Sequence, residues 1–351
     1  MSSIINNKDI TIVMHGAVVS PPDMFEKYRY SDIALESLRR VFPGSYIILS
    51  TWKDQVVPAH YQKNLIDYLI SSPDPGPSFI SRDQKFSHNM DRHIQSSRRG
   101  LNKVKTKYTL LIRTDLLIES RKIVEKFQKY STLIEKPEWA GMNEPILALA
   151  GGTKYEKSIV KQYPFHTCDF LYFGRTEDLL SLFDLEICSD GRFCSNESKK
   201  PIKKHVMFYF SERASERDEF LKKSMENPYY MQRYIAETFP IISYLKRIGV
   251  IENSHSWYSD HESIKNSFAW HTKSTILVSA YLSGVRWLKS PYCYQKFPGG
   301  AFFRYTEYLW LYSVKKNIFE KASLLFMHYL WAFLRGFLCF LTIFIRKKIL
   351  R

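Results

Sequence analysis

The sequence predicts an α/β fold with a mostly parallel sheet flanked by helices. Apolar and amphipathic segments alternate through the first 118 residues, in the order strand, helix, strand, helix, strand. The composition agrees, since 45% of the 351 residues are hydrophobic and 25% are charged. A globular chain of this length buries a large core without disulfides.

The first elements follow from local patterns. Residues 10–14 form a short apolar run that ends at His15 and Gly16, which predicts a buried strand. Helical spacing predicts a helix over residues 31–41, with Ser31 as its N-cap. Residues 46–51 are rich in β-forming side chains and predict the second strand.

The middle of the chain continues this alternation. The Asp-Pro-Gly-Pro run at residues 74–77 predicts a loop, and residues 89–104 predict a helix. Residues 108–118 predict an apolar strand that Arg113, Thr114 and Asp115 interrupt. Further strands and helices are expected at 170–174, at 177–183 and at 229–248, the last of these interrupted at Pro240. Residues 189–205 are expected to form a basic surface loop.

Charge and cysteine content narrow the class of protein. The 51 Lys and Arg against 35 Asp and Glu give a net charge of +16, which attracts nucleic acid, anionic lipid or phosphorylated substrates. The five cysteines include no C-x-x-C pair, so reduced thiols in the cytosol are expected rather than a disulfide framework or a structural zinc site. The sequence also lacks the motifs of serine hydrolases, P-loop NTPases and dinucleotide-binding dehydrogenases.

Polar residues gather at the ends of the expected strands. They are His15 and Gly16 after the first strand, Trp52 and Asp54 after the second, Arg113 and Asp115 in the third, and Asp169 beside the fourth. Ligands of open α/β sheets bind beyond the carboxyl ends of the strands. These positions therefore predict a ligand site.

Asp115 is the most informative of them. A carboxylate inside an apolar strand must be paired, bound to a metal or open to a cleft, because burying it alone is costly. It could hold a divalent cation that neutralises a nucleotide diphosphate. The alternative is an ion pair between Arg113 and Asp115 that closes a turn.

One face of the helix expected at 89–104 is polar. Asn89, Arg92 and Ser96 lie at positions i, i+3 and i+7 and therefore share this face. Arg92 is suited to phosphate or sugar oxygens. A solvated helix surface is the alternative, and His88 and His93 are interpreted as ordinary polar histidines.

The C-terminal segment suggests membrane contact. Residues 322–345 are apolar and long enough to cross a bilayer, but Arg335 falls near their middle, where a charge is costly. We expect a helix that lies in the plane of an anionic membrane surface, with the final basic residues at the headgroups. A spanning helix and a soluble core helix are the alternatives. The first residues show no signal-peptide pattern.

Several motifs occur in a characteristic order. They are HG at 15–16, SLRRVFPGSYIILSTW at 37–52, DPGP at 74–77, HNMDRHIQSSRRGL at 88–101, YTLLIRTD at 108–115 and CDFLYFG at 168–174. In this order, over about residues 10–180, the chain resembles the WavE-type lipopolysaccharide core synthesis proteins.

The resemblance implies a GT-A-like glycosyltransferase domain over residues 1–318. Residues 1–120 would form its nucleotide-sugar half and 121–318 its acceptor half, with a membrane-associated helix at 319–351. The implied activity moves a sugar from a nucleotide-sugar donor to a lipid-linked glycan, such as lipopolysaccharide core or surface polysaccharide. The expected location is the cytoplasmic face of the bacterial inner membrane, with peripheral or monotopic attachment through the C-terminal segment.

The leading hypothesis assigns a role to each candidate residue, and the metal-binding role follows from the resemblance. The donor would be bound by His15, Gly16, Trp52, Asp54, Asn89, Arg92 and Arg113. Asp115 would bind Mn²⁺ or Mg²⁺, although the D-x-D-like motif of such folds is here Arg113-Thr114-Asp115, with only the last acid present. Asp169 is the first candidate for the general base and Glu237 the second.

A non-enzymatic alternative remains. A basic peripheral membrane protein or a nucleic-acid-binding protein would also carry this charge. The Lys and Arg residues are, however, spread along the chain, and no nucleic-acid-binding motif occurs. We therefore expect no nucleic acid among the partners.

Overall fold

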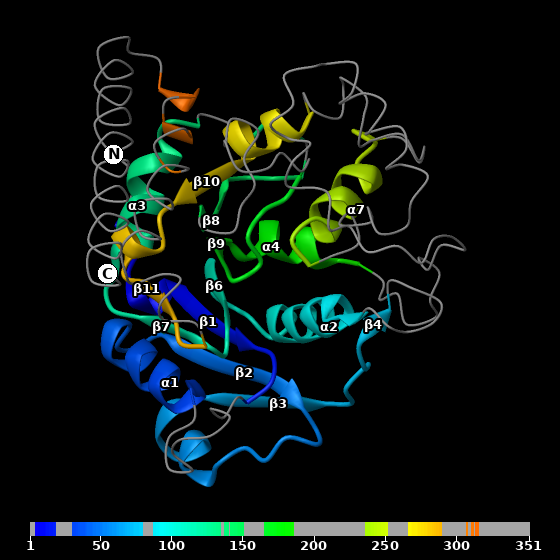
Figure 1. Ribbon diagram of the computed structural model, residues 1–351. Coiled ribbons are helices and arrows are strands. Elements are labelled where there is room, and N and C mark those ends of the chain that lie inside the picture. Colours follow the sequence, from blue (N-terminus) through cyan, green and yellow to red (C-terminus); the bar gives the residue numbers. More distant parts are fainter. Residues whose placement is uncertain are drawn as a thin grey trace, which may run out of the picture.

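A seven-stranded sheet forms the centre of the computed structural model (Figure 1). Its strand order is β10-β8-β9-β6-β1-β2-β3. The structure describes residues 4–18, 30–79, 87–134, 137–139, 141–150, 165–185, 236–251, 266–289, 307, 310–311 and 313–315.

Four strands form a parallel half of the sheet. They are β1 (Ile10–His15), β2 (Tyr46–Trp52), β3 (Tyr68–Ser72) and β6 (Tyr108–Arg113). β1 is buried along its whole length, as expected of a parallel strand that is covered on both faces. Strands β2 and β6 flank β1, so the chain order reverses between β1 and β6, where open α/β sheets bind their ligands.

The other half of the sheet is mixed. β8 (Ile146–Leu149) and β10 (Thr275–Val278) pair in parallel, whereas β9 (Leu171–Arg175) runs antiparallel to both β6 and β8. The expected mostly parallel sheet is thus confirmed, with β9 as the exception. Because β9 is reversed, its beginning lies at the edge where β1 and β6 end.

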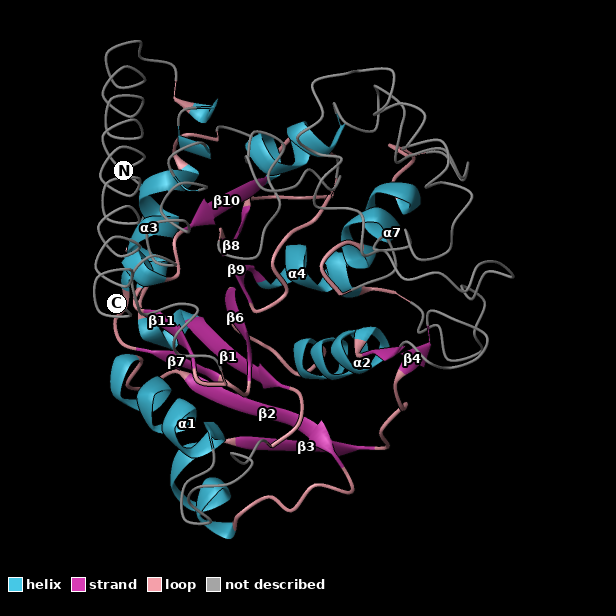
Figure 2. Ribbon diagram, in the orientation of Figure 1, coloured by secondary structure: helices cyan, strands magenta, loops and turns pink. Residues whose placement is uncertain are grey.

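Helices cover both faces of the sheet (Figure 2). They are α1 (Tyr30–Val41), α2 (Met90–Leu101), α3 (Lys122–Ser131), α4 (Thr176–Phe183) and α7 (Phe239–Arg247). α2 packs against β1, β2 and α4, and α4 in turn packs against α7. α3 packs against β9 and β10.

The shorter elements complete the described part of the chain. They are η1 (Asn7–Asp9), η2 (Tyr61–Leu65), β4 (Ser78–Phe79), β5 (Ser87–His88), β7 (Leu116–Ile118), η5 (Trp270–Ser274), η6 (Tyr281–Ser283) and β11 (Val285–Trp287). β4 pairs with β5, and β7 pairs antiparallel with β11. The strand expected at 108–118 is therefore two strands, and the second of them joins a separate ribbon.

Some predicted boundaries were wrong. α1 begins at Tyr30, so Ser31 lies inside the helix instead of capping it, and α2 ends at Leu101 rather than at residue 104. Pro240 lies in the first turn of α7, where its missing N–H is not needed. Of the helix expected at 229–248, the described residues therefore contain only α7, which follows a turn at 236–238.

Three predicted segments lie outside the described residues. They are the loop at 189–205, the start of the helix expected at 229–248 and the C-terminal helix at 319–351. Among the helices that are described, none combines the length and the apolar character needed to cross a membrane.

The contact between α2 and β1 depends on Gly100. A Cβ atom added there would collide with Cγ1 of Val13, which is fully buried in β1. Glycine therefore lets the helix approach the sheet closely beneath the end of β1.

We expect Gly100→Ala to lower the free energy of unfolding by up to about 2 kcal/mol in total, because the stiff Val13 side chain has no room to move and overpacking of this kind costs about 1–3 kcal/mol. This cost exceeds the gain of about 1 kcal/mol in helix propensity. Urea unfolding measures it. The double variant Val13→Ala/Gly100→Ala should lose less stability than the sum of the losses measured for the two single variants. An unchanged urea midpoint for Gly100→Ala would contradict this contact.

Candidate functional site

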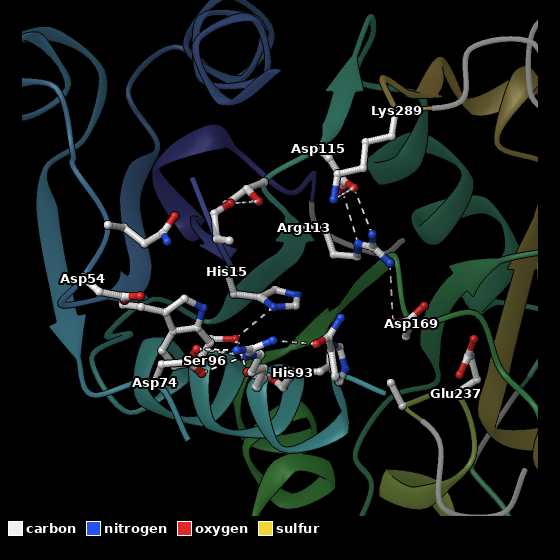
Figure 3. A pocket seen from close by; sticks show the side chains of 18 residues that line it. His15, Asp54, Asp74, His93, Ser96, Arg113, Asp115, Asp169, Glu237 and Lys289 are labelled. Atoms are coloured by element: carbon white, nitrogen blue, oxygen red, sulfur yellow. Dashed lines mark hydrogen bonds and ion pairs between the residues drawn. The ribbon is translucent and has the colours of Figure 1, made fainter. Parts of the chain in front are cut away.

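A cavity of about 610 Å³ lies at the carboxyl ends of the parallel strands (Figure 3). All ten residues singled out from the sequence line it. They are His15, Gly16, Trp52, Asp54, Asn89, Arg92, Arg113, Asp115, Asp169 and Glu237. The structure thus brings together in one place positions that are up to 222 residues apart in the chain, from His15 to Glu237.

The ends of β1 and β6 form the centre of the cavity. His15 is in register with Arg113, and the Thr114 amide donates a hydrogen bond to the His15 carbonyl at 3.2 Å. Gly16 has a φ of +111°, a conformation that favours glycine, and its amide donates to the Ser50 carbonyl at 3.0 Å. The chain therefore turns sharply beside Thr114.

Acidic residues follow β2 and β3 at one end of the cavity. Asp54 comes two residues after β2, and Asp74 two residues after β3. Arg92 of α2 donates from Nε and Nη2 to the Asp74 carboxylate at 2.8 and 2.5 Å, and from Nη1 to Asn89 Oδ1 at 3.0 Å. Its hydrogen bond to Asp74 raises the pKa of Arg92 and lowers that of Asp74.

This pairing bears on the predicted role of Arg92. Asn89, Arg92 and Ser96 share the cavity face of α2, as their spacing indicates. Arg92, however, is bound to Asp74, so in this structure it connects α2 to the loop after β3. A direct contact of Arg92 with a ligand stays a prediction.

Two buried histidines lie between the ends of the cavity. His15 Nδ1 is 3.3 Å from Ser96 Oγ, which itself donates to the Arg92 carbonyl at 2.7 Å. The Nδ1–H tautomer of His15 satisfies this geometry. Nε2 of His15 and Nε2 of His93 have no hydrogen-bond partner within the described residues. The two rings meet edge to face, 4.9 Å apart.

Both histidines are neutral at pH 7. Burial, with the help of Arg113, lowers the pKa of His93 to about 4, although Asp169 opposes this shift. Burial and then the neighbouring His93 and Arg113 hold the pKa of His15 well below its usual value. The interpretation of His93 as an ordinary polar histidine was therefore wrong, since it is buried and lines the cavity.

A compact cluster surrounds the Asp115 carboxylate. Arg113 donates from Nε to Oδ1 at 3.1 Å and from Nη2 to Oδ2 at 2.9 Å, while Trp287 Nε1 donates to Oδ2 at 2.9 Å. Lys289 Nζ lies 3.3 Å from the same Oδ2. Burial raises the pKa of Asp115, but Arg113, Lys289 and Trp287 outweigh it and hold the pKa below its usual value.

Arg113 is fixed from both sides. Its guanidinium lies 4.4 Å from the centre of the Phe170 ring, and its Nη1 is 3.7 Å from Asp169 Oδ2. Burial alone lowers the pKa of Arg113, yet Asp169 and Asp115 raise it above the ordinary value. Arg113 is therefore a permanent cation in the cavity wall.

The surroundings of Asp115 do not fit Mn²⁺ or Mg²⁺. The residue is 1% exposed, and both carboxylate oxygens already accept hydrogen bonds. A divalent ion there would lie beside Arg113 and Lys289, and at 4 Å each pair of unit charges repels by about 4 kcal/mol at an effective dielectric constant of 20. Nor do the described residues contain any group of three potential metal-binding side chains. The ion pair between Arg113 and Asp115, which was the alternative to a metal ligand, is present.

The two candidate bases lie at the end opposite to Asp54 and Asp74 (Figure 3). Asp169 comes just before β9 and is 8% exposed. Glu237 comes just before α7, where its carbonyl accepts a hydrogen bond from the Thr167 amide at 2.9 Å. This contact connects the segments that carry the two carboxylates.

Sequence reasoning missed Asp74 and Lys289 as cavity residues. Asp74 could have been found from the sequence, because it follows the segment that forms β3, but that strand was not predicted. Lys289 carried no signal, since only the pairing of β11 with β7 brings it to Asp115.

Open α/β sheets bind their ligands at the switch point of the strand order, and this polar cavity lies at that point. The chain belongs to the WavE lipopolysaccharide synthesis family, whose model matches residues 10–236. No curated protein matches it significantly. Among solved structures, the crystal structure of S. aureus TarS matches at 14% identity with a TM-score of 0.28. That match covers 51% of this chain but only 32% of the TarS chain, and such a slight likeness carries no argument about function.

The pKa of His93 predicts a pH dependence of stability. The imidazole titrates near 6.5 when unfolded and near 4 when folded, so between these values the unfolded chain binds the extra proton. The stability that comes from the neutral His93 should be fully present above pH 6.5. As the pH decreases towards 4, the free energy of unfolding should fall by up to about 3 kcal/mol. His93→Phe keeps an aromatic ring and should flatten this slope. Urea unfolding of both proteins at pH 5 and 7 measures it, and parallel slopes would refute the assignment.

Proposed function

We propose that this protein is a glycosyltransferase that moves a sugar from a nucleotide-sugar donor to a lipid-linked glycan, such as lipopolysaccharide core or surface polysaccharide. One observation carries the proposal. In a chain of the lipopolysaccharide synthesis family, every residue selected from the sequence lines the same switch-point cavity. A cavity of about 610 Å³ has the size of a typical small-molecule site.

The two ends of the cavity suit different parts of the donor. Trp52 and Asp54, at the end of β2, offer an aromatic surface and a hydrogen-bond acceptor for the nucleoside. Arg113, at the end of β6, provides positive charge for the phosphates. The sugar would then point towards Asp169 and Glu237, where the acceptor hydroxyl must also arrive.

In an inverting reaction the acceptor hydroxyl attacks the anomeric carbon as the bond to phosphate breaks. The carboxylate of Asp169 would take the hydroxyl proton, and the nucleoside diphosphate would leave with the bonding electron pair. Arg113, 3.7 Å from Asp169, would stabilise the negative charge that develops on the leaving phosphate. Glu237 is the second candidate for the base.

The rival proposal is a non-enzymatic, basic membrane-surface or nucleic-acid-binding protein. The cavity favours the enzyme, because a surface binder has no need of neutral histidines and a fixed arginine within a recess.

Attachment to the cytoplasmic face of the bacterial inner membrane is part of the proposal. It depends on the sequence of residues 322–345 and the basic residues after them, outside the described residues. Carbonate-washed membranes from cells that make the full chain, or a chain ending at residue 318, would test it. A truncated protein that stays with the membranes would contradict the role of residues 319–351 as the anchor.

A panel of UDP, GDP, ADP and CMP tests the donor class. A nucleotide at one hundred times its Kd should stabilise the protein by about 2.7 kcal/mol, visible as a rise in the thermal midpoint. We expect one base to be clearly preferred. If no member of the panel shifts the midpoint, with or without Mn²⁺, the glycosyltransferase proposal fails.

Asp169→Asn should lower kcat by about a hundredfold or more while donor affinity changes little, because a general base acts in the transition state. Glu237→Gln is the matched comparison and should have the smaller effect. Steady-state kinetics and donor titration separate the two parameters. If Glu237→Gln loses kcat and Asp169→Asn does not, the base is Glu237.

A further inference from the structure

We propose that Arg113 and Lys289 supply the positive charge that binds the donor diphosphate, so that this site binds its nucleotide without a divalent cation. The inference rests on the proposed function and specifies how that same site recognises phosphate. It follows from the arrangement of charges around Asp115.

Asp115 acts in this arrangement as an anchor for cations. Its carboxylate accepts hydrogen bonds from Arg113 and from the Trp287 indole, and Lys289 Nζ lies 3.3 Å away. A metal ion at these oxygens would lie directly beside those donors and compete with them for the carboxylate. The carboxylate therefore orients two basic side chains, where a D-x-D-like motif would orient an ion.

Both cations keep donors for a ligand. Arg113 uses Nε and Nη2 on Asp115, and within the described residues its Nη1 makes no hydrogen bond, with Asp169 Oδ2 at 3.7 Å. Lys289 has three N–H donors, and its side chain is 40% exposed and lines the cavity. A phosphate oxygen in the cavity can thus approach both groups.

The two basic side chains also match a divalent ion in formal charge. Arg113 and Lys289 together carry two positive charges, as one Mn²⁺ or Mg²⁺ ion does. Phe170 and Asp115 hold the guanidinium in place, so little ordering is needed when the ligand binds. Guanidinium and ammonium groups are both common phosphate ligands in proteins.

Isothermal titration calorimetry on the full-length protein tests the inference. UDP, GDP, ADP and CMP are titrated after removal of metal, in excess EDTA and again with Mn²⁺. The nucleoside of the preferred base and inorganic pyrophosphate are titrated alongside. We expect the preferred nucleoside diphosphate to bind with Kd values within about twofold in EDTA and in Mn²⁺, and the nucleoside to bind far more weakly.

Lys289→Met removes the charge and keeps most of the apolar stem at a partly exposed position, so the protein should still fold. It should weaken the nucleoside diphosphate about tenfold or more in EDTA, which is the usual loss for a charge-assisted hydrogen bond, and leave the nucleoside unchanged. Lys273→Met is the matched control. Lys273 is also partly exposed and paired with an acid, Glu138 at 2.6 Å, but it lies outside the cavity lining.

The outcomes are distinct. Binding of a nucleoside diphosphate that disappears in EDTA and returns with Mn²⁺ overturns this inference and leaves the proposed function standing. Unchanged affinity in Lys289→Met overturns the role of Lys289. If no nucleotide binds under either condition, the proposed function itself fails. Tight binding of pyrophosphate alone, with no preference for any base, marks an anion site and also counts against a donor site.

Discussion

The parallel pairing of β1 with β6 is the constraint on which the site depends. Because both strands end at the same edge, His15 and Arg113 are brought into register, and the chain must turn away from the sheet at Gly16 and Thr114. Every other cavity residue is positioned relative to this edge. α2 can bring its polar face there only because Gly100 lets the helix approach β1 closely.

A buried charge imposes the second constraint. Asp115 is almost fully enclosed, so its carboxylate requires compensation from Arg113, Trp287 and Lys289. The same contacts that stabilise this carboxylate fix two cations at the cavity wall. Under the proposed function, this one set of interactions would both compensate the buried carboxylate and bind phosphate, although Arg113-Thr114-Asp115 has only the last acid of a D-x-D-like motif.

The sequence predicted the elements that have strong local patterns. β1, β2, β6 and α2 are uniform apolar runs or regular helical repeats, and the polar residues at their ends therefore marked the cavity correctly. β3, β8 and β10 are short, and their burial comes from neighbours that are distant in the chain. The same limit hid Lys289, whose position depends on a pairing with β7, and His93, whose burial depends on packing against His15 and Phe183.

The ribbon of β7 and β11 makes the site a late product of folding. Trp287, which donates to Asp115, lies 172 residues further along the chain. Trp287 and Lys289 reach Asp115 only when β11 pairs with β7. During synthesis the first parallel strands can assemble while this carboxylate still lacks two of its donors. The entropy cost of closing the long loop between β7 and β11 grows only slowly with its length. The delay in completing the contacts of Asp115 therefore arises mainly from the time needed to synthesise the chain. The complete cavity wall therefore exists only on a chain that has been synthesised past residue 289.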